Sequence, residues 1–521
     1  MRQEKNRKKF SRRKFLVGSG QFVAAGSALP VYSASGAGNY FSLGVASGAP
    51  RPDGVILWTR LAPNPLNGGG MSNLPAQVRV RVYQDPELRA KIIDDVITAT
   101  ANEGHSVHYH AKGLFAGREY WYQFSFDDVD SPVGRTKTTN PRDDRAKIAL
   151  AYCQNYESGF FSAYRDLANW TPDCVIHTGD YIYEGAAGEL GARMRRVAED
   201  KRQLFERVRT HEGAEITSLW DYRNRYAQYK LDKDLQAAHA AAPWIMAMDD
   251  HEVDNNWAGA IPQDPQKQTP LEFRVRKLAA FRAYYEHMPI ERPPALQGTD
   301  SQLQMYGAFR FGPAQVHLLD TRQFRDDQSC GDRRKVYCEE TLNPERSMLG
   351  KAQETWLFDR LKASSSPHNV IASQVWFTPY KFNAEDTEAV RNLDSWDGYP
   401  AARSRLSNVL ASGVNRPLVL SGDWHIAMAS TLHADPLDRN SPRVGHELVG
   451  SSISSGCPWS YQMQQVRDQN RQVQYLNGEQ RGYLRTTFTK DDCIADFRMV
   501  KDSGLPDSPA YTDLEIRTSE V

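Results

Sequence analysis

Residues 418–425 of this 521-residue chain, Leu418-Val419-Leu420-Ser421-Gly422-Asp423-Trp424-His425, carry the clearest indication of its fold. This stretch starts as a short apolar run, typical of a strand buried on both faces of a parallel sheet, and it ends abruptly in Asp423 and His425. In open α/β sheets, ligands bind beyond the carboxyl ends of the strands. A buried carboxylate is rare unless it is paired or bound to a metal. The stretch therefore predicts an α/β fold with a polar site at the edge of its sheet.

Further apolar runs along the chain lead into polar residues in the same way. They cover residues 148–152, 174–177, 244–248, 316–319 and 370–374, and the polar residues that end or follow them include Cys153, Asp180, Asp250, Arg322 and Gln374. Long segments separate the runs, and those at 189–233 and 272–287 have the composition of helices. Because the carboxyl ends of parallel strands share one edge of a sheet, we expect these polar side chains to converge in space.

The converging residues would bring together carboxylates, a thiol, a phenol, amides and imidazoles. That mixture suits several metal ions better than a serine triad or a redox thiol pair. Asp180 is the candidate for a carboxylate that bridges two metals, an arrangement that can clamp a phosphoryl group. Gly179 directly before it allows a sharp turn at the strand end.

The region before these buried apolar runs has a different sequence pattern and is predicted to be a separate domain. Residues 41–139 alternate in short strand-like runs broken by Gly, Pro and Asp turns, which predicts a small β-sandwich. The segment 113–122 has the pattern of a tyrosine corner before a late strand of a fibronectin- or immunoglobulin-like domain. A polar linker then leads into the main domain, predicted over residues 147–500, and residues 501–521 are predicted to be a polar tail.

The first 37 residues indicate export. Basic residues precede Ser11-Arg12-Arg13-Lys14-Phe15-Leu16 and a weakly apolar stretch, a pattern that resembles a twin-arginine signal peptide. It predicts the twin-arginine export machinery as a partner and a periplasmic or secreted protein. No later stretch has the roughly 18 apolar residues that a membrane span needs.

Overall charge and cysteine content exclude other classes. Lys plus Arg and Asp plus Glu both number 64, so the formal net charge is zero and no nucleic-acid-binding module is indicated. The six cysteines are too few for a disulfide scaffold in so long a chain. Cys330 and Cys338 flank a polar loop and could form a bridge in an oxidising compartment, although the sequence does not fix the pairing.

Four ordered motifs together resemble the PhoD-type alkaline phosphatases, a branch of the calcineurin-like metallophosphoesterases. They are Cys153-Gln154-Asn155, the run from Gly179 to Glu184, the run from Asp249 to Trp257, and Ser421-Gly422-Asp423-Trp424-His425. The export signal and the N-terminal sandwich fit the same family. The resemblance implies a two-sheet α/β/β/α sandwich. It also implies a phosphoesterase that hydrolyses small-molecule phosphomonoesters, phosphodiesters or both through attack by a metal-bound oxide or hydroxide.

The resemblance also implies a set of metal ligands. Cys153, Asp180, Tyr183 and His425 would hold a ferric ion, and two calcium ions would lie on Asp180, Asp250 and Asp423, with Asn255 as a further ligand. Thiolate and phenolate suit iron, whereas carboxylate and carbonyl oxygens suit calcium. Zinc or manganese stays open from the sequence alone. His251 is the candidate proton donor to the leaving group, and Arg322 is either a phosphate ligand or a structural ion-pair partner.

Three other functions compete with this hypothesis. The same metal scaffold could act as a phospholipase D-like phosphodiesterase on phospholipids or nucleic-acid ends. A non-catalytic, secreted calcium-binding protein would account for the carboxylates but not for Cys153 and His425. A twin-arginine redox enzyme lacks support, because the chain has neither a Cys-x-x-Cys motif nor a cofactor glycine fingerprint. Two further histidines, His177 and His317, lie inside apolar runs and are interpreted as core residues.

Overall fold

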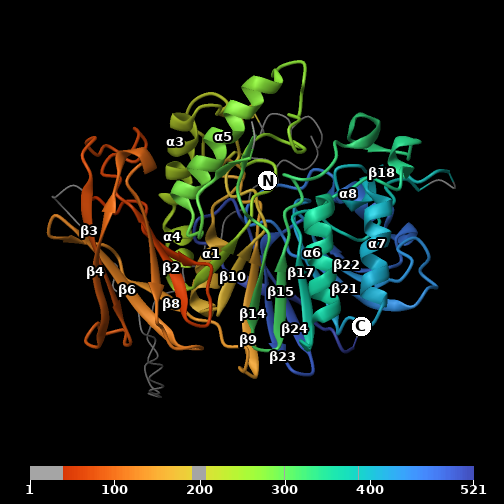
Figure 1. The fold of residues 1–521 in the computed structure, drawn as a ribbon. Helices are drawn as coiled ribbons and strands as arrows, with labels where there is room; N and C mark the ends of the chain where they lie inside the picture. Colours follow the sequence, from red (N-terminus) through yellow and green to blue (C-terminus); the bar gives the residue numbers. More distant parts are fainter. Residues whose placement is uncertain (1–38, 190–206, 298–299, 385–386, 521) are drawn as a thin grey trace, which may run out of the picture. The chain divides into compact units, whose positions relative to one another are not determined.

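The computed structural model describes residues 39–189, 207–297, 300–384 and 387–520. The chain divides into two units, Met1–Ala37 and Gly38–Val521. The predicted export signal, residues 1–37, lies outside the described residues. Figure 1 shows the fold of the second unit.

The largest sheet in the described part of the chain has nine strands in the order β25-β24-β23-β9-β10-β11-β1-β2-β5. Their bounds are β1 Val45–Gly48, β2 Gly54–Arg60, β5 Ser106–Lys112, β9 Arg145–Ala151, β10 Cys174–His177, β11 Pro243–Met246, β23 Arg481–Thr489, β24 Cys493–Val500 and β25 Ala510–Arg517. Its central strands β9, β10 and β11 are parallel, with Val175 opposite Ala149 and Trp244. Three of the apolar runs predicted to be buried strands therefore lie side by side.

The second large sheet has seven strands within the described residues, in the order β14-β15-β17-β19-β21-β20-β22. Their bounds are β14 Gly307–Phe311, β15 Ala314–Leu318, β17 His368–Ala372, β19 Pro417–Ser421, β20 Ala427–His433, β21 Arg443–Val449 and β22 Val473–Asn477. The strands β15, β17, β19 and β21 are parallel neighbours. The remaining predicted runs are thus strands of this sheet, and β19 contains the apolar part of residues 418–425.

Alternate residues of this sheet enter two different cores, as the two-residue period of a strand requires. Leu418 and Leu420 of β19 belong to the main core, which also contains Ile148 and Leu150 of the nine-stranded sheet. Val419 belongs to a second core, formed with the helices α6 (Gly350–Ala363) and α7 (Pro400–Ala411). These helices lie over the outer side of the seven-stranded sheet in Figure 1. The strands are therefore buried on both faces, which explains their unbroken apolar sequence.

Helices also cover the nine-stranded sheet and lie beside its carboxyl edge. They are α1 Ser162–Trp170, α3 Leu219–Lys230, α4 Lys233–Ala241 and α5 Pro270–His287. Ser218 begins α3 and Thr269 begins α5, and each forms a capping box with an acidic residue three positions later. The segment predicted as helical at 272–287 lies within α5, and part of that predicted at 189–233 is α3, whereas residues 190–206 lie outside the described residues.

The N-terminal region contains a five-stranded sheet, counted within the described residues: β3 Ala76–Tyr83, β4 Lys91–Ala99, β6 Glu119–Phe126, β7 Val129–Asp130 and β8 Gly134–Lys137. It packs against β1, β2 and β5 through a core that includes Leu57, Val80 and Tyr122. The backbone N–H of Phe115 donates a hydrogen bond of 2.8 Å to the Tyr120 hydroxyl, which confirms the tyrosine corner.

Two features of the termini differ from the expectations. The strand β1 pairs in parallel with β11, so the layer that packs against the five-stranded sheet is continuous with the main sheet. Residues predicted as a polar tail include β25, which pairs with the preceding strand β24 along the edge of the same sheet. The pairing of β1 with β11 joins segments far apart in the sequence, whereas most residues of β25 are exposed or only partly buried, so its sequence is largely polar.

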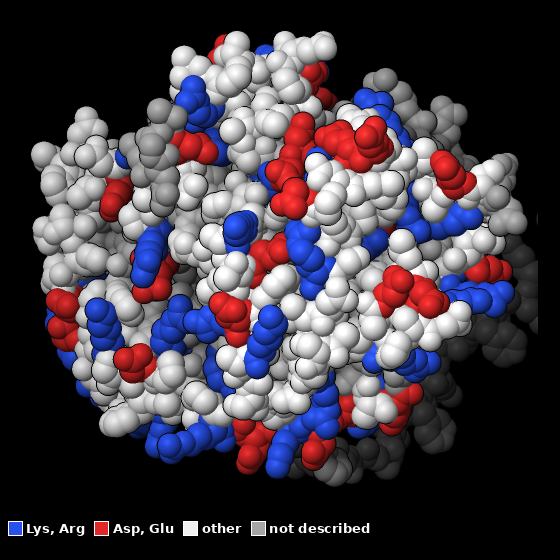
Figure 2. All heavy atoms as spheres, turned by 45° about the vertical axis from the view of Figure 1, so that its right-hand side comes forward, with Lys and Arg blue, Asp and Glu red and all other residues white. Residues whose placement is uncertain are grey.

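The described surface agrees with the zero net charge. Figure 2 shows acidic and basic side chains interspersed over the face that it draws, without a field of one sign across that face. Among the described helices, none combines the length and the apolar character that would be needed to cross a bilayer.

Candidate metal centre

The predicted site residues meet where the parallel strands of both large sheets end. Cys153 follows β9, Asp180 follows β10 and Asp250 follows β11, all in the nine-stranded sheet. Asp423 and His425 follow β19 of the seven-stranded sheet. The described residues contain three groups of possible ligand atoms, and within each group all the atoms lie within 4.8 Å of one another. Asp180 belongs to all three groups. We call Cys153, Asp180, Tyr183, Asp250, Asp423 and His425 the donor cluster.

One side of the donor cluster combines sulfur, phenol and imidazole around Asp180. The Cys153 thiol donates to Asp180 Oδ2 over 3.1 Å, and the Tyr183 hydroxyl lies 3.0 Å from the same oxygen. The Tyr183 hydroxyl also lies 3.2 Å from His425 Nε2. Cys153, Asp180 and His425 form one of the three ligand groups. The four residues assigned to iron in the sequence analysis are therefore neighbours.

Outer contacts fix the orientation of these ligands. His425 Nδ1 lies 2.7 Å from the carbonyl oxygen of Gly456, and a proton on Nδ1 leaves Nε2 with a free lone pair directed at the cluster. The Ser455 hydroxyl lies 2.7 Å from the Tyr183 hydroxyl and 2.8 Å from the carbonyl oxygen of Cys153. Ser455 follows β21 in a run of small polar residues, and the sequence analysis did not identify it.

The other side of the cluster contains oxygen ligands. Asp180, Asp249, Asp250 and Asp423 form the second ligand group, and Asp180, Asp250 and His251 form the third. Asp250 Oδ2 accepts a hydrogen bond of 2.9 Å from the backbone N–H of Asn256, whereas the buried Asp250 Oδ1 has no hydrogen-bond partner among the described residues. The nearest guanidinium nitrogen, Arg322 Nη2, is 3.7 Å from Asp250 Oδ1. Arg322 balances part of the charge of this carboxylate, and a cation at Oδ1 would displace no hydrogen bond among the described residues.

The backbone is strained at the ligands. Cys153, Asp180, Asp423 and His425 all have a positive φ, between 52° and 72°, a region that is uncommon for residues other than glycine. Strain of this kind clusters at functional sites, where the surrounding structure enforces it. Gly179, at φ +116°, also requires the absence of a side chain, since a Cβ atom there would lie 2.3 Å from the backbone nitrogen of Asp249.

Electrostatics show that the cluster holds more negative charge than its protein neighbours balance. Burial raises the pKa of Asp180 well above its ordinary value, and the nearby carboxylates of Asp250 and Asp249 raise it further, against the effect of His251. Burial and the same two carboxylates also raise the pKa of Asp423. Burial, followed by Asp180, raises the pKa of Cys153 in the same way. A cation among these groups would reverse each of these penalties.

His251 is held beside the cluster by Glu184. His251 Nδ1 lies 2.6 Å from Glu184 Oε2, and its ring packs against that of Tyr183 with 4.1 Å between the centroids. Burial lowers the pKa of His251, but Glu184 and the cluster carboxylates outweigh it and raise the pKa well above the ordinary value. The contact with Glu184 and the carboxylates of the donor cluster therefore favour the protonated form of His251.

Arg322 is engaged with carboxylates on all sides. Its Nε donates to Asp249 Oδ1 over 2.5 Å, and Nη1 and Nη2 donate to the two carboxylate oxygens of Asp394 over 2.8 and 2.9 Å. Arg325 Nη2 also contacts Asp394, at 3.1 Å. We call Arg322, Arg325, Asp249 and Asp394 the arginine network. Of the two roles considered for Arg322, this geometry favours the structural ion-pair partner over a phosphate ligand.

Asn255 lies beside the cluster in a different way from the other predicted ligands. Its backbone N–H donates to Glu184 Oε1 over 3.0 Å, while the next residue, Asn256, contacts Asp250. Other residues near the site were not assigned a role from the sequence. Glu252 accepts hydrogen bonds from the backbone N–H groups of Asp180, Tyr181 and Asp249. Glu252 and Asp249 lie inside a quoted motif, so proximity in sequence was the available signal, whereas Asp394 comes from a loop without one.

Comparisons with known proteins find similar sequences and a similar structure over most of the chain. A family model described as PhoD-like phosphatase matches residues 148–497, and one described as the N-terminal domain of PhoD-like phosphatases matches residues 26–140. The chain is 41% identical over 509 residues to alkaline phosphatase D of Bacillus subtilis (strain 168), which covers 94% of this chain and 84% of that protein. The solved structure of PhoD is similar with a TM-score of 0.86 and 40% identity, covering 93% of this chain and 91% of that one.

Proposed function

The chain belongs to the PhoD-like phosphatase family, and on that premise we propose how its donor cluster hydrolyses phosphate esters. It is a phosphatase that acts on small-molecule substrates. The observation that carries the proposal is the position of Asp180, whose carboxylate is shared by all three groups of ligand atoms. A carboxylate in that position can bridge metal ions in a site for phosphoryl transfer.

We propose that the two sides of the cluster bind different cations. Cys153, Tyr183 and His425 with Asp180 supply the softer, strongly donating ligands that suit a ferric ion. Asp250 and Asp423 with Asp180 supply hard oxygens that suit calcium, and Asp250 Oδ1, which accepts no hydrogen bond among the described residues, supports a cation on that side. When bound, these cations would neutralise phosphoryl oxygens and make a water molecule nucleophilic near neutral pH.

The protein's own groups would position the ester and move protons. His251, kept protonated by Glu184, lies where it can donate a proton to the leaving oxygen of the ester. The arginine network would act one layer further out, because Arg322 uses Nε, Nη1 and Nη2 to bind the carboxylates of Asp249 and Asp394. Glu252 would keep the turns after β10 and β11 in register through its backbone hydrogen bonds.

We also propose the finer description of the fold and of the route out of the cytoplasm. The two mixed sheets with helices outside support a calcineurin-like α/β/β/α sandwich, and the packing of the five-stranded sheet on β1, β2 and β5 supports an immunoglobulin- or fibronectin-like N-terminal region. The twin-arginine pattern in residues 1–37 supports export to the periplasm or the medium.

Elemental analysis and a visible spectrum of the purified protein test the cation assignment. We expect iron and calcium, hydrolysis of 4-nitrophenyl phosphate or bis(4-nitrophenyl) phosphate, and a phenolate-to-iron charge-transfer band that disappears in Tyr183→Phe. Chelation should abolish hydrolysis, and calcium should restore it only while iron is retained. An active, colourless enzyme without iron would contradict the assignment of Cys153, Tyr183 and His425.

A further inference from the structure

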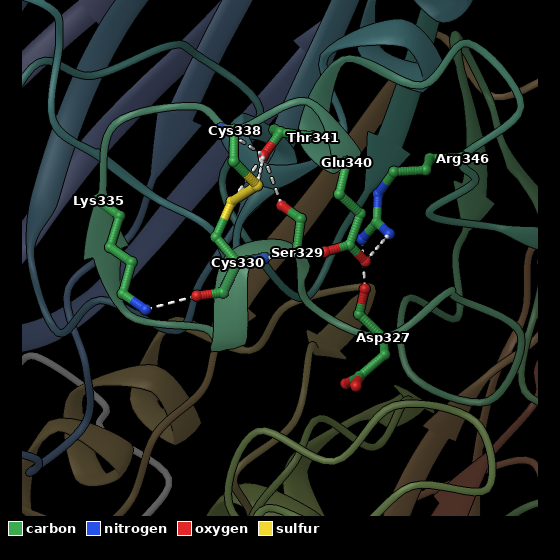
Figure 3. The surroundings of a disulfide bond; sticks show 8 residues. All are labelled: Asp327, Ser329, Cys330, Lys335, Cys338, Glu340, Thr341 and Arg346. Carbon is green, nitrogen blue, oxygen red and sulfur yellow. Dashed lines mark hydrogen bonds and ion pairs between the residues drawn. A yellow bond between two sulfur atoms is a disulfide. The ribbon is translucent and has the colours of Figure 1, made fainter.

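A loop closed by a disulfide lies next to the arginine network and the donor cluster. Cys330 and Cys338 form the bond, and we call residues 330–338 the disulfide loop. Figure 3 shows the bond beside the hydroxyl of Thr341, which lies 3.2 Å from the sulfur of Cys330. The backbone N–H of Cys330 donates to Glu340 Oε2 over 3.1 Å. The outer end of the loop is therefore anchored to the segment that follows it.

The inner part of the loop contacts a residue that binds Asp250. Asn256 Nδ2 donates a hydrogen bond of 2.7 Å to Asp332 Oδ2, and the backbone N–H of the same asparagine donates to Asp250 Oδ2 over 2.9 Å. Gln328, just before the loop, donates to the carbonyl oxygen of Asn256 over 2.8 Å and to Asp394 Oδ1 over 2.7 Å. Asp332 of the disulfide loop therefore holds the side chain of Asn256, and Gln328 holds its carbonyl group. The backbone N–H of Asn256 in turn fixes the orientation of the Asp250 carboxylate.

A second connection joins the loop to the arginine network. The strand β16 (Arg334–Lys335) pairs with β18 (Arg391–Asn392), and the carbonyl oxygen of Arg333 accepts a hydrogen bond of 3.0 Å from the backbone N–H of Leu393. Leu393 precedes Asp394, the carboxylate that binds Arg322 in a bidentate manner. The disulfide loop is therefore connected to Asp250 through Asn256 and to the segment of Asp394 through Leu393.

The loop retains features that stability alone does not explain. Cys330, Gly331, Asp332 and Arg333 are four consecutive residues with a positive φ, between 57° and 76°, a region that is uncommon for the three that are not glycine. Asp332 Oδ1 is buried and has no hydrogen-bond partner among the described residues. An unsatisfied carboxylate oxygen and a strained backbone both cost free energy, and such costs persist where the surrounding structure enforces them for function.

We propose that Asp332 is a positioning residue, fixed by the Cys330–Cys338 disulfide, which holds Asn256 so that Asp250 is directed at a divalent cation. The proposal rests on the proposed function, because it requires a cation on Asp250. Asp332 acts through its hydrogen bond to Asn256 and has no direct role at the reacting atoms. Loss of this support frees the Asn256 side chain, relaxes the hydrogen bond to Asp250 and weakens cation binding.

Calorimetric titration of chelator-treated protein with CaCl₂, and in parallel with MnCl₂, tests this inference without any assay of activity. Asp332→Gly removes the carboxylate, and glycine accepts the local φ of +63° without strain. The dissociation constant of the Asp332→Gly variant for the cation should rise on the order of 10-fold relative to wild type, as is usual when a residue that orients a metal ligand is lost. Asp332→Asn keeps an acceptor for Asn256 and should stay within about 3-fold of wild type, as a purely hydrogen-bonding role requires.

The matched control is Asp128→Gly, the same substitution at φ +59° in the exposed turn between β6 and β7, and it should bind the cation as wild type does. Cys330→Ser combined with Cys338→Ser should weaken binding in the same direction as Asp332→Gly. Its binding result remains interpretable if Asp332→Gly folds poorly.

The outcomes separate this inference from the proposed function. Equal cation affinity in Asp332→Gly and Asp128→Gly, with wild type binding normally, would overturn the role of Asp332 and leave the donor cluster assignment intact. An Asp332→Asn variant as weak as Asp332→Gly would also overturn it, since the charge and not the hydrogen bond would then matter. A wild-type protein that takes up neither cation would refute the proposed function itself.

Discussion

The donor cluster and the arginine network both bury carboxylates, but the negative charge of these carboxylates is balanced differently in the two regions. In the network, Asp394 faces two guanidinium groups, and the pKa of its carboxyl is lowered because Arg322 and Arg325 outweigh its burial. In the cluster, the pKa of Asp180 and of Asp423 is raised, because burial and neighbouring carboxylates outweigh His251 and Arg322 respectively. The protein's own cations therefore balance Asp394, whereas they do not balance Asp180 and Asp423.

The largest effect is expected from Asp180→Asn, which removes the charge shared by the three ligand groups and keeps the shape of the side chain. Catalytic efficiency toward 4-nitrophenyl phosphate should fall about 10⁴-fold, equivalent to about 5 kcal/mol of transition-state stabilisation. In chelator-treated protein the unfolding midpoint should not fall, because repulsion from Asp250 is relieved. Asp143→Asn in the linker before β9 is the control and should keep wild-type efficiency. A variant within 10-fold of wild type would contradict the bridging role.

The opposite pattern is expected in the arginine network. Asp394→Asn leaves Arg322 and Arg325 buried with too little negative charge, and breaking a buried pair of this kind costs about 3–5 kcal/mol of unfolding free energy. The loss should appear in urea and thermal unfolding with or without chelator, since no cation compensates for it. The same substitution at the exposed pair of Asp94 with Arg79 should leave the unfolding midpoint unchanged. If Asp394→Asn is as stable as wild type, the network is not a structural unit.

Sequence reasoning located the buried strands and the residues of the donor cluster because both follow one physical rule. Runs buried on both faces must be apolar throughout, and polar residues at their carboxyl ends must then meet, as Cys153, Asp180 and His425 do. It did not identify the pairing of β1 with β11, because strand pairing across long sequence distances leaves no local signal. It missed the edge strand β25 because most of its residues are not buried and its sequence is largely polar. Asp394 and Ser455 were missed because they come from loops whose polar residues look like solvent-exposed ones, whereas Asn256 lies within a quoted motif that did not reveal its role.

Removal of cations should affect the cluster and spare the network. A ligand that binds only the folded state at 100 times its dissociation constant adds about 2.7 kcal/mol of stability. Chelation of the loaded protein should therefore lower its unfolding temperature, and CaCl₂ added to the protein that retains iron should restore it. In Asp180→Asn the same treatment should cause a much smaller change. An unfolding temperature of wild type that is independent of chelator would show that the cluster is balanced without a cation.

The smallest effect, and the one whose sign separates the two regions, is the pH dependence of the chelator-treated protein. Asp180 and Asp423 have folded pKa values raised above the ordinary 3.8, so above pH 4 the folded protein retains protons that the unfolded chain has released. These two carboxyl groups therefore contribute a stability that falls as the pH rises from about 4 toward neutrality. Buried histidines such as His177 and His425, whose pKa is lowered, contribute a stability that rises as the pH rises to about 6.5. Asp394 has a lowered pKa and contributes with the opposite sign to Asp180 and Asp423. Its contribution to stability is fully present above the pKa of the unfolded chain and is lost only as the pH falls through the folded pKa.

The slope can be assigned to the cluster by two comparisons of the unfolding temperature at pH 5 and pH 8. The change in unfolding temperature from pH 5 to pH 8 should be more negative in chelator-treated wild type than in chelator-treated Asp180→Asn, which has no proton to retain at that position and carries the same buried histidines. Loading wild type with the cation should remove this negative contribution, because protons and the cation compete for the same oxygens and the cation binds more tightly as the pH rises. An equal change in chelator-treated wild type and Asp180→Asn would mean that the Asp180 carboxyl retains no proton in the folded protein, and the contrast between the two regions would not hold.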